Sequence, residues 1–457
     1  MQTNIRCMFK RSTRVAAWLL TLSIIAATLS SLASAKPPVV QDEQSEQKWR
    51  EDLQSLVTGL RRNHPNPFHG IPEADFEAAV ASLDARIATL TDSQINREFI
   101  GLAALISRNG RDGHTQYLPS LMNLHPLPLQ LYTFSDGLFI IDARQPYEAL
   151  IGRQVTAIGD HAVEEVMAAL TPYITKDNDS TVQWFMPTFL IFPEFLESFG
   201  FIADPDQVPL RLQDDSGEEE TVTISPITVS EYVAWREFPA IKLPQTHDEL
   251  YLSDSYDPFW FTFLADSGTL YIRYNQIARK NDSGQKMNKF VKKIKKEIKK
   301  KPVQRLVLDL RQNNGGDNTT YGSLLTALKD NAAINQPGKL FAIINRGVFS
   351  AAANFVTDLE KQTNVVFVGE PTGGSPNHYG DAVPVVLPNF GGTLLVSTVY
   401  HQRSEPNDAR LSVEPDIAVE LSAADYFSGR DAAMAAILEF TAQQQTIRRA
   451  GQSHSGK

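Results

Sequence analysis

The sequence predicts three folded parts in succession: a helical domain, a mixed α+β domain, and an α/β domain with parallel strands. Apolar residues first recur at helical spacing, short β-like runs follow, and strands then alternate with helices. The length of 457 residues fits two or three domains at roughly 100 to 200 residues each. We therefore expect a multidomain protein whose last part is the α/β domain.

Composition and charge restrict the function. The chain is 42% hydrophobic and 21% charged, which is typical of a globular protein. Its 53 acidic residues outnumber 43 Lys and Arg, giving a net charge of −10, which argues against nucleic acid as a partner. The only cysteine is Cys7. Without it the mature chain has no thiol, which excludes cysteine catalysis, zinc-thiolate sites and disulfides.

The first 35 residues have the pattern of an export signal. Basic residues precede the apolar run 15–32, which ends at the small residues Ala33-Ser34-Ala35. We predict cleavage at about Ala35, a periplasmic or secreted protein, and no stable membrane insertion afterwards. An uncleaved anchor helix is the alternative, weakened by Ser and Thr within the run. Residues 36–47 are polar and are expected to form a flexible mature N-terminus.

Residues 48–125 are predicted to form the helical domain. A first helix places Leu53, Leu56 and Leu60 on one face and ends at the turn-rich 64–70. A second helix contains Leu83 on its apolar face. A third helix follows a predicted N-cap at 91–93 and ends at 109–110.

The next parts are predicted from shorter patterns. In the α+β domain (126–228) we expect strands at 129–134, 138–141, 154–158, 208–212 and 220–224, and a helix at 162–170. Residues 229–265 are an unassigned connecting segment. In the α/β domain (266–440) we expect strands at 269–275, 303–310, 339–345 and 365–368, with helices between them. Residues 441–457 form a polar tail.

One helix of the α/β domain is rich in lysine. Nine lysines lie between Lys286 and Lys301, while Phe290, Val291 and Ile294 keep an apolar stripe. The prediction takes the lysines as the solvated outer face of a crossover helix. An anionic membrane or ligand surface is the alternative.

Several common motifs are absent. The chain has no dinucleotide-binding glycine motif, no P-loop, no HExxH and no GxSxG. His64 and His69 are close in sequence, but a spacing of five does not place them on one helical face. We therefore predict no metal and no cofactor. Ser283-x-x-Lys286 matches a lactamase-type motif without its companions and is taken as chance.

Two turns of the α/β domain could build an oxyanion site. A buried-type strand runs into Asn313-Asn314-Gly315-Gly316, whose backbone N–H groups can be approached closely. One βα unit later, Ser350 begins a helix beside the N–H of Ala351. Because both turns follow parallel strands, they should meet at one edge of the sheet. The alternative is that Ser350 is only a helix N-cap.

The ordered motifs of this domain resemble those of the carboxyl-terminal-processing (tail-specific) serine peptidase family. They are Asp309 to Gly316, Gly347 to Ala352, Val368 to Gly374 and Glu414 to Ile417. Arg111 to Thr115 also looks like the D-G-H-T turn of the branch that includes the tricorn core and interphotoreceptor retinoid-binding protein. The similarity spans about 50–440. It implies a crotonase/ClpP-like α/β catalytic domain with Ser350 as the nucleophile and Gly315, Gly316 and Ala351 around the oxyanion.

The resemblance also suggests the base. Where the Ser/Lys branch has its lysine, this chain has Ser375, so the base is assigned to His114, with His378 and His401 as alternatives. In the tricorn core a serine precedes the histidine, and Gly113 replaces it here.

The third member of the site is assigned from its position before the family's Pro-Asp motif. This places Asp408 as the group that orients His114, with Glu405 and Glu414 as alternatives. An exposed loop carboxylate without a role is a further possibility.

The α+β domain resembles the later half of a PDZ-like module at 149–160, without a clear carboxylate-binding loop. Recognition of C-terminal tails therefore stays open.

The resulting hypothesis is an exported serine endopeptidase that cleaves polypeptides through an acyl-enzyme. The alternative is a hydrophobic-ligand or peptide-binding protein on the same scaffold, because the retinoid-binding relatives are carriers. An esterase would use the same residues on another substrate. The substrate and the oligomeric state are not indicated by the sequence.

Overall fold

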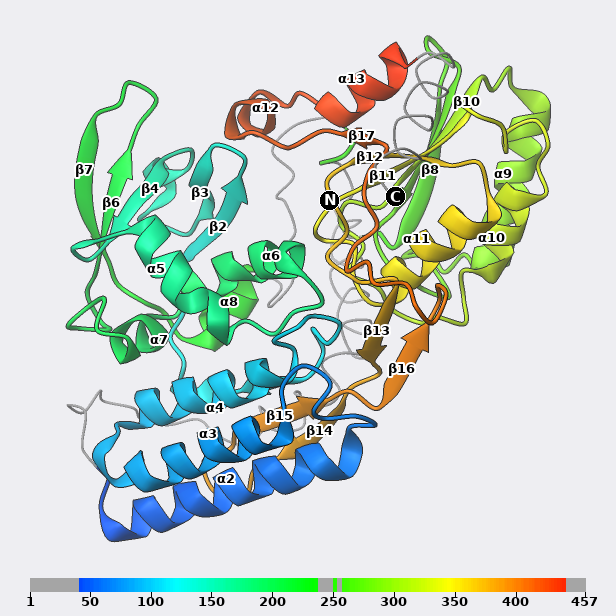
Figure 1. Ribbon diagram of the computed structural model, residues 1–457. Helices are drawn as coiled ribbons and strands as arrows, with labels where there is room; N and C mark the ends of the chain where they lie inside the picture. The colour runs from blue at the N-terminus through cyan, green and yellow to red at the C-terminus, as the bar shows by residue number, and fades with distance from the viewer. Residues whose placement is uncertain (1–40, 237–249, 253–256, 441–457) are drawn as a thin grey trace, which may run out of the picture.

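The computed structural model describes residues 41–236, 250–252 and 257–440 (Figure 1). The predicted signal peptide, residues 36–40 of the predicted flexible N-terminus and the polar tail lie outside these ranges. Within them, no helix has the length and apolar character needed to cross a membrane.

The helical domain forms as expected from its periodicity. It consists of α2 (Glu43–Asn63), α3 (Glu73–Arg86) and α4 (Asp92–Ile106), with a 3₁₀ turn at Ile87–Thr89. Thr91 caps α4 in a reciprocal capping box with Gln94. α2 starts inside the segment predicted to be flexible, because Asp42 accepts a hydrogen bond from the N–H of Ser45 and so caps the helix.

The middle domain is an antiparallel sheet with helices. Its strands lie in the order β2-β3-β4-β6-β7, with β5 beside β4. They are β2 (Leu129–Phe134), β3 (Gly137–Ala143), β4 (Gln154–Ile158), β5 (His161–Ala162), β6 (Val208–Gln213) and β7 (Glu219–Ile224). The helices are α5 (Val163–Leu170), α6 (Asp179–Leu190), α7 (Pro193–Ser198) and α8 (Val229–Trp235). β2, β3, β4, β6, β7 and α5 agree with the prediction, whereas β5 and α6 to α8 were not predicted.

The third part is a six-stranded sheet in the order β17-β12-β11-β10-β9-β8. Its strands are β8 (Phe259–Leu264), β9 (Thr269–Tyr274), β10 (Arg305–Asp309), β11 (Leu340–Ile344), β12 (Val366–Gly369) and β17 (Ile417–Ala418). Within this sheet, β9, β10, β11, β12 and β17 run parallel to one another, and the parallel arrangement was predicted. β8 pairs with β9 in the antiparallel direction. The helices are α9 (Met287–Lys300), α10 (Gly322–Lys329), α11 (Ala351–Gln362), α12 (Ala423–Ser428) and α13 (Ala432–Glu439).

Strands late in the chain return to the helical domain. β13 (Asn377–Gly380) pairs with β16 (Val399–Gln402), and β14 (Val383–Val386) pairs with β15 (Thr393–Val396). β15 also pairs with β1 (Gln116–Leu118), so Figure 1 shows β14 and β15 beside α2. Leu387, Leu394 and Val396 are buried in the core formed by the helical and middle domains. Part of the predicted α/β domain therefore packs as an extension of the helical domain.

Candidate active site

Ser350 and His114 meet in the structure. His114 lies in the turn before β1, and Ser350 is the residue before α11. The Nε2 atom of His114 lies 3.0 Å from the Oγ atom of Ser350, although the residues are 236 positions apart. This is the geometry that a nucleophile and its general base require.

The backbone of Ser350 has a conformation that L-residues rarely adopt. Its φ is 55° and its ψ is −127°, and the side chain makes no hydrogen bond that caps α11. A non-glycine residue with positive φ costs free energy and persists only where the surroundings enforce it. The structure therefore does not support a capping role for this serine, because its hydroxyl faces His114 instead.

The glycine turn packs directly against Ser350. A Cβ on Gly315 would lie 2.8 Å from the Cβ of Ser350 and 2.9 Å from the backbone N of Ala351, and its φ is +109°. Only glycine fits at that position. The side chain of Asn313 holds the turn by accepting a hydrogen bond from Gly315 N and donating one to the Tyr274 carbonyl.

Two backbone N–H groups beside the nucleophile remain available. Gly315 N–H is already bonded to Asn313, but the N–H groups of Gly316 and Ala351 have no acceptor among the described residues. Two donors of this kind can hold an oxyanion. Of the two predicted glycines, Gly316 is therefore the better donor candidate.

The imidazole of His114 is enclosed by other rings. It stacks on Phe349 with ring centroids 4.5 Å apart and lies parallel to the His378 ring at 5.9 Å. Burial, together with the neighbouring His378, lowers the pKa of His114 to about 3. The ring is therefore neutral at physiological pH, which is the form that can accept a proton from a serine hydroxyl.

The alternative bases have other roles. The Nδ1 atom of His378 lies 2.8 Å from the carbonyl oxygen of Ser375, and burial lowers the pKa of His378. His401 lies 3.4 Å from the carboxylate of Asp381. Among the described residues, neither of these imidazoles has a hydrogen bond to Ser350.

The predicted carboxylates do not contact His114 within the described part of the chain. Asp408 accepts hydrogen bonds from the hydroxyl of Ser404 at 2.5 Å and from the guanidinium of Arg410 at 2.8 Å. The hydrogen bonds from Arg410 hold the pKa of Asp408 well below its usual range. Glu405 lies near Lys361, and Glu414 accepts a hydrogen bond from Ser412. Among the described residues, no side chain forms a hydrogen bond with the buried Nδ1 of His114.

A carboxylate that was not predicted lies two residues before the histidine. Asp112 is fully buried and accepts hydrogen bonds from His64 Nε2 at 2.9 Å, Ser397 Oγ at 2.6 Å and Thr115 N at 3.0 Å. Burial alone would raise the pKa of Asp112, but the hydrogen bonds from the histidine side chains outweigh it and hold that pKa well below its usual range. The charge of Asp112 in turn favours the protonated form of His114. Asp112 is the first residue of the D-G-H-T motif, so the motif itself was the sequence signal for this carboxylate.

The ligand types around Asp112 also raise the question of a metal. The side chains of His64, His69 and Asp112 each place one ligand atom within 4.8 Å of the others. However, the Nδ1 atom of His64 accepts a hydrogen bond from the backbone N–H of Asn66 at 3.0 Å. The proton of a neutral His64 is therefore on Nε2, where it is donated to Asp112. The cluster fits a hydrogen-bonded pair better than a metal centre.

A second buried aspartate joins the loops around the site. Asp177 accepts hydrogen bonds from Gly113 N at 2.7 Å and Ser375 N at 2.9 Å. Burial raises the pKa of Asp177 to about 7. The hydroxyl of Ser375 donates to the Leu411 carbonyl at 2.6 Å, so this serine, in the place of the lysine, holds a loop.

One comparison with known protein families matches part of the α/β domain. Residues 268–336 match the model of Peptidase family S41. This segment includes the glycine turn but neither Ser350 nor His114. No curated protein matches the chain.

Solved structures extend the likeness over most of the chain. Mature CPAF has a TM-score of 0.60 at 14% identity, covering 88% of this chain and 98% of that one. Mature CPAF complexed with lactacystin has a TM-score of 0.59 at 14% identity with the same coverage. The photosystem II D1 C-terminal processing protease has a TM-score of 0.39 at 14% identity, covering 81% of this chain and 93% of that one. The protein thus shares the fold of mature CPAF, and the S41 match indicates a peptidase.

Proposed function

We propose that the protein is an exported serine endopeptidase that hydrolyses peptide bonds of polypeptide substrates. The observation that carries this proposal is the 3.0 Å contact between His114 Nε2 and Ser350 Oγ. The N–H groups of Gly316 and Ala351, which have no acceptor in the part of the chain that the structure describes, support it. The S41 match and the shared fold support the same class of reaction. The export signal at 1–35 is proposed from the sequence alone.

The reaction follows from this arrangement. Ser350 Oγ attacks the peptide carbonyl carbon while His114 Nε2 takes its proton, and Gly316 N–H and Ala351 N–H hold the developing oxyanion. His114 then gives the proton to the leaving amine, which leaves an ester on Ser350. A water molecule, deprotonated by His114, attacks the ester and releases the new carboxylate and the free serine. The charge of Asp112 stabilises the imidazolium that forms on His114 during acylation and again during deacylation.

A third member of the site would be a carboxylate that acts on His114. Asp408 can orient His114 only after its carboxylate releases Ser404 and Arg410, two residues of the same loop that bind it in this structure. Asp112 acts on His114 by charge without moving. We therefore propose that the described arrangement works as a dyad assisted by Asp112.

Labelling with a fluorophosphonate and measuring the intact mass tests the proposal. The parent should gain one adduct, Ser350→Ala should gain none, and His114→Ala should react many orders of magnitude more slowly, since loss of a nucleophile or base costs about 10⁶ in rate. Ser422→Ala is the control because Ser422, like Ser350, directly precedes a helix, but its side chain caps α12. It should label like the parent. A folded parent that forms no adduct would favour the binding-protein alternative.

A further inference from the structure

The outward face of α9 carries an unusual charge. The lysine face is defined here as nine lysines of α9 and the residues that flank it: Lys286, Lys289, Lys292, Lys293, Lys295, Lys296, Lys299, Lys300 and Lys301. All are exposed, while Met287, Phe290, Val291 and Ile294 on the opposite side are buried in the core. The helix is therefore fixed to the sheet by its apolar side, and the lysines cannot turn inward.

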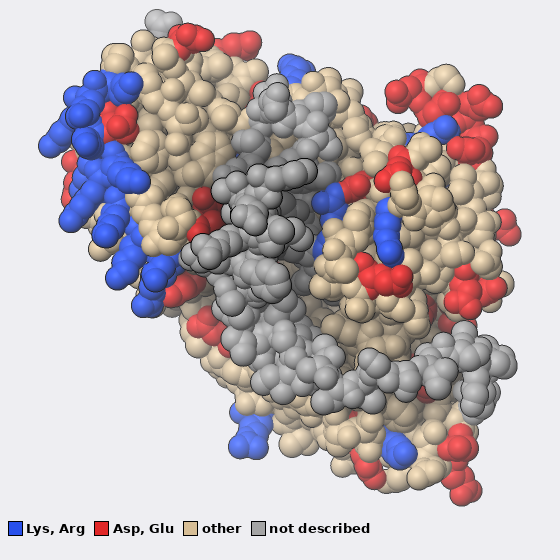
Figure 2. Space-filling model, turned by 180° about the vertical axis from the view of Figure 1, so that it is seen from behind, with Lys and Arg blue, Asp and Glu red and all other residues tan. Residues whose placement is uncertain are grey.

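The lysine face lacks counter-charges. None of its nine side chains forms an ion pair with any of the described residues, and α9 contains a single acid, Glu297. The whole chain has a net charge of −10, so this positive surface is opposite in sign to the molecule. Figure 2 shows a dense cluster of Lys and Arg side chains along one edge of the molecule, while the other Lys and Arg side chains in that view are scattered. An uncompensated concentration of like charge is unfavourable unless an anionic partner offsets it.

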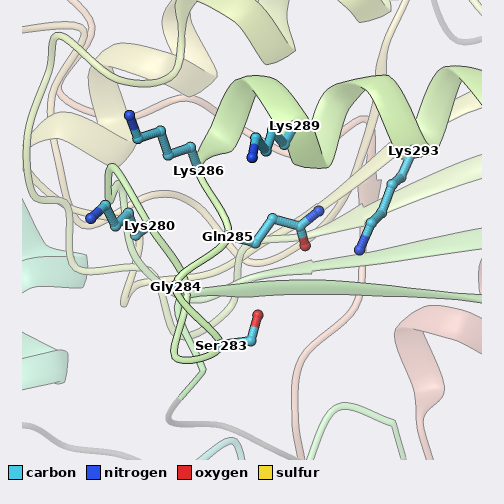
Figure 3. A pocket seen from close by; sticks show the side chains of 7 residues that line it. All are labelled: Lys280, Ser283, Gly284, Gln285, Lys286, Lys289 and Lys293. Carbon is cyan, nitrogen blue, oxygen red and sulfur yellow. The ribbon is translucent and has the colours of Figure 1, made fainter.

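One end of the lysine face is hollowed. Lys280, Lys286, Lys289 and Lys293 line a cavity of about 370 Å³ together with Ser283, Gly284 and Gln285 (Figure 3). The lining contains no acid, and the buried Nε2 group of Gln285 has no hydrogen-bond acceptor within the described ranges. A cavity with these donors suits an anionic group such as a phosphate.

We propose that the lysine face docks the protein on a bilayer of anionic phospholipid, with one headgroup phosphate in the hollow. The exposed side of α9 has neither arginine, which would recognise a fixed planar anion, nor an aromatic ring on which a nucleotide base could stack. Lysines on a flat face are suited to a diffuse anionic surface. Because the apolar side of α9 is buried, the contact is electrostatic and peripheral, and it does not depend on the chemistry at Ser350.

Vesicle co-sedimentation of the full chain tests this docking. The probes are vesicles of phosphatidylcholine with and without phosphatidylglycerol, and the neutral vesicles report any binding by the apolar N-terminal segment. The variant carries Lys292→Gln, Lys296→Gln and Lys299→Gln. The matched control carries Lys48→Gln, Lys329→Gln and Lys361→Gln. These substitutions change the net charge equally but lie outside the lysine face, and Lys329 donates a hydrogen bond to Gln362. Thermal unfolding of each protein verifies the fold.

We expect binding to the anionic vesicles only. It should weaken on the order of a hundredfold in the lysine-face variant, because each lysine near an anionic surface contributes about fivefold, and stay near the parent value in the control. Raising the ionic strength from about 0.1 M to about 1 M shortens the Debye length from about 10 Å to about 3 Å and should release the protein. Equal loss in both variants, equal binding to neutral vesicles, or displacement by duplex DNA at the same salt would each overturn the proposal.

Discussion

The lowered pKa of His114 sets the pH range in which Ser350 can be activated. A histidine whose pKa is lowered stays neutral at lower pH, so its base function is present above about pH 3 and is lost as the pH falls through that value. The rate of fluorophosphonate labelling of the free protein should therefore stay level from neutral pH to about pH 4. A midpoint near the ordinary histidine value of about 6.5 would contradict the buried, neutral base.

The lowered pKa of His114 should also make the folded protein less stable in acid. Below pH 6.5 the unfolded chain binds a proton at His114 and the folded protein does not until about pH 3. The free energy of unfolding should then fall by up to about 1.4 kcal/mol per pH unit in that window from this group alone. Labelling rates are therefore to be compared only where circular dichroism shows the folded protein.

Asp408 offers a second test at the scale of single residues. Asp408→Asn removes the charge that binds Arg410, but it removes no hydrogen bond of His114. We expect the labelling rate to fall by less than about tenfold, whereas loss of a true orienting carboxylate costs about 10⁴. Asp112→Asn should slow labelling more than Asp408→Asn does. The reverse order would show that the loop carrying Asp408 closes on the histidine.

At the scale of elements, the glycine turn after β10 shapes the oxyanion site. Gly315→Ala would place a Cβ 2.8 Å from the Cβ of Ser350 at a φ of +109°, so the turn must shift. We expect labelling to fall by about 10² to 10³, the cost of one lost oxyanion donor. Gly322→Ala is the control, since its Cβ meets nothing within 4 Å at the start of α10. Equal rates for both variants would remove the turn from the site.

The sequence predicted the elements whose pattern is local. The parallel strands β9 to β12, the helix after Ser350 and the capped α4 follow directly from periodicity and capping residues. Helix α6 was missed because Pro187 interrupts an aromatic-rich stretch that has no clear periodicity. β1 and β14 to β16 were missed because they have only three or four residues each and are defined by pairing with distant segments.

The site shows the same limit. Ser350, His114 and the glycine turn were identified from motifs, and the structure brings them together. The partners of Asp408 could not be predicted, because Ser404 and Arg410 bind it through the fold of one loop. The burial of Asp112 and His64 depends on how the helical domain packs on the returning strands, which no local pattern encodes.

At the scale of the whole molecule, the domains are joined by buried hydrogen bonds. Asn178 caps α6 with its side-chain oxygen, and its amide nitrogen donates to the carbonyls of Thr372 at 2.9 Å and Leu411 at 2.6 Å. These bonds fix the middle domain on the loops that surround Ser350. The labelling rate should therefore depend on residues that do not touch the nucleophile.

Asn178→Asp tests this coupling. The aspartate keeps the helix cap but removes both donors, so we expect a loss of about 1 to 3 kcal/mol in the free energy of unfolding, together with slower labelling. Urea unfolding and the labelling rate measure the two effects. Asn178→Ala removes the cap as well and should be less stable still. If only the alanine variant lost stability, the cap alone would account for the role of this residue.

The pairing of β1 with β15 has a consequence for the synthesis of the protein. The turn that holds His114 continues into β1, whose partner residues 393–395 leave the ribosome after Ser350 does. A growing chain therefore carries both reactive side chains before it has the strand that fixes one against the other. On the proposed chemistry, the nascent polypeptide should therefore stay inert until residues 393–395 have been made and have paired with β1.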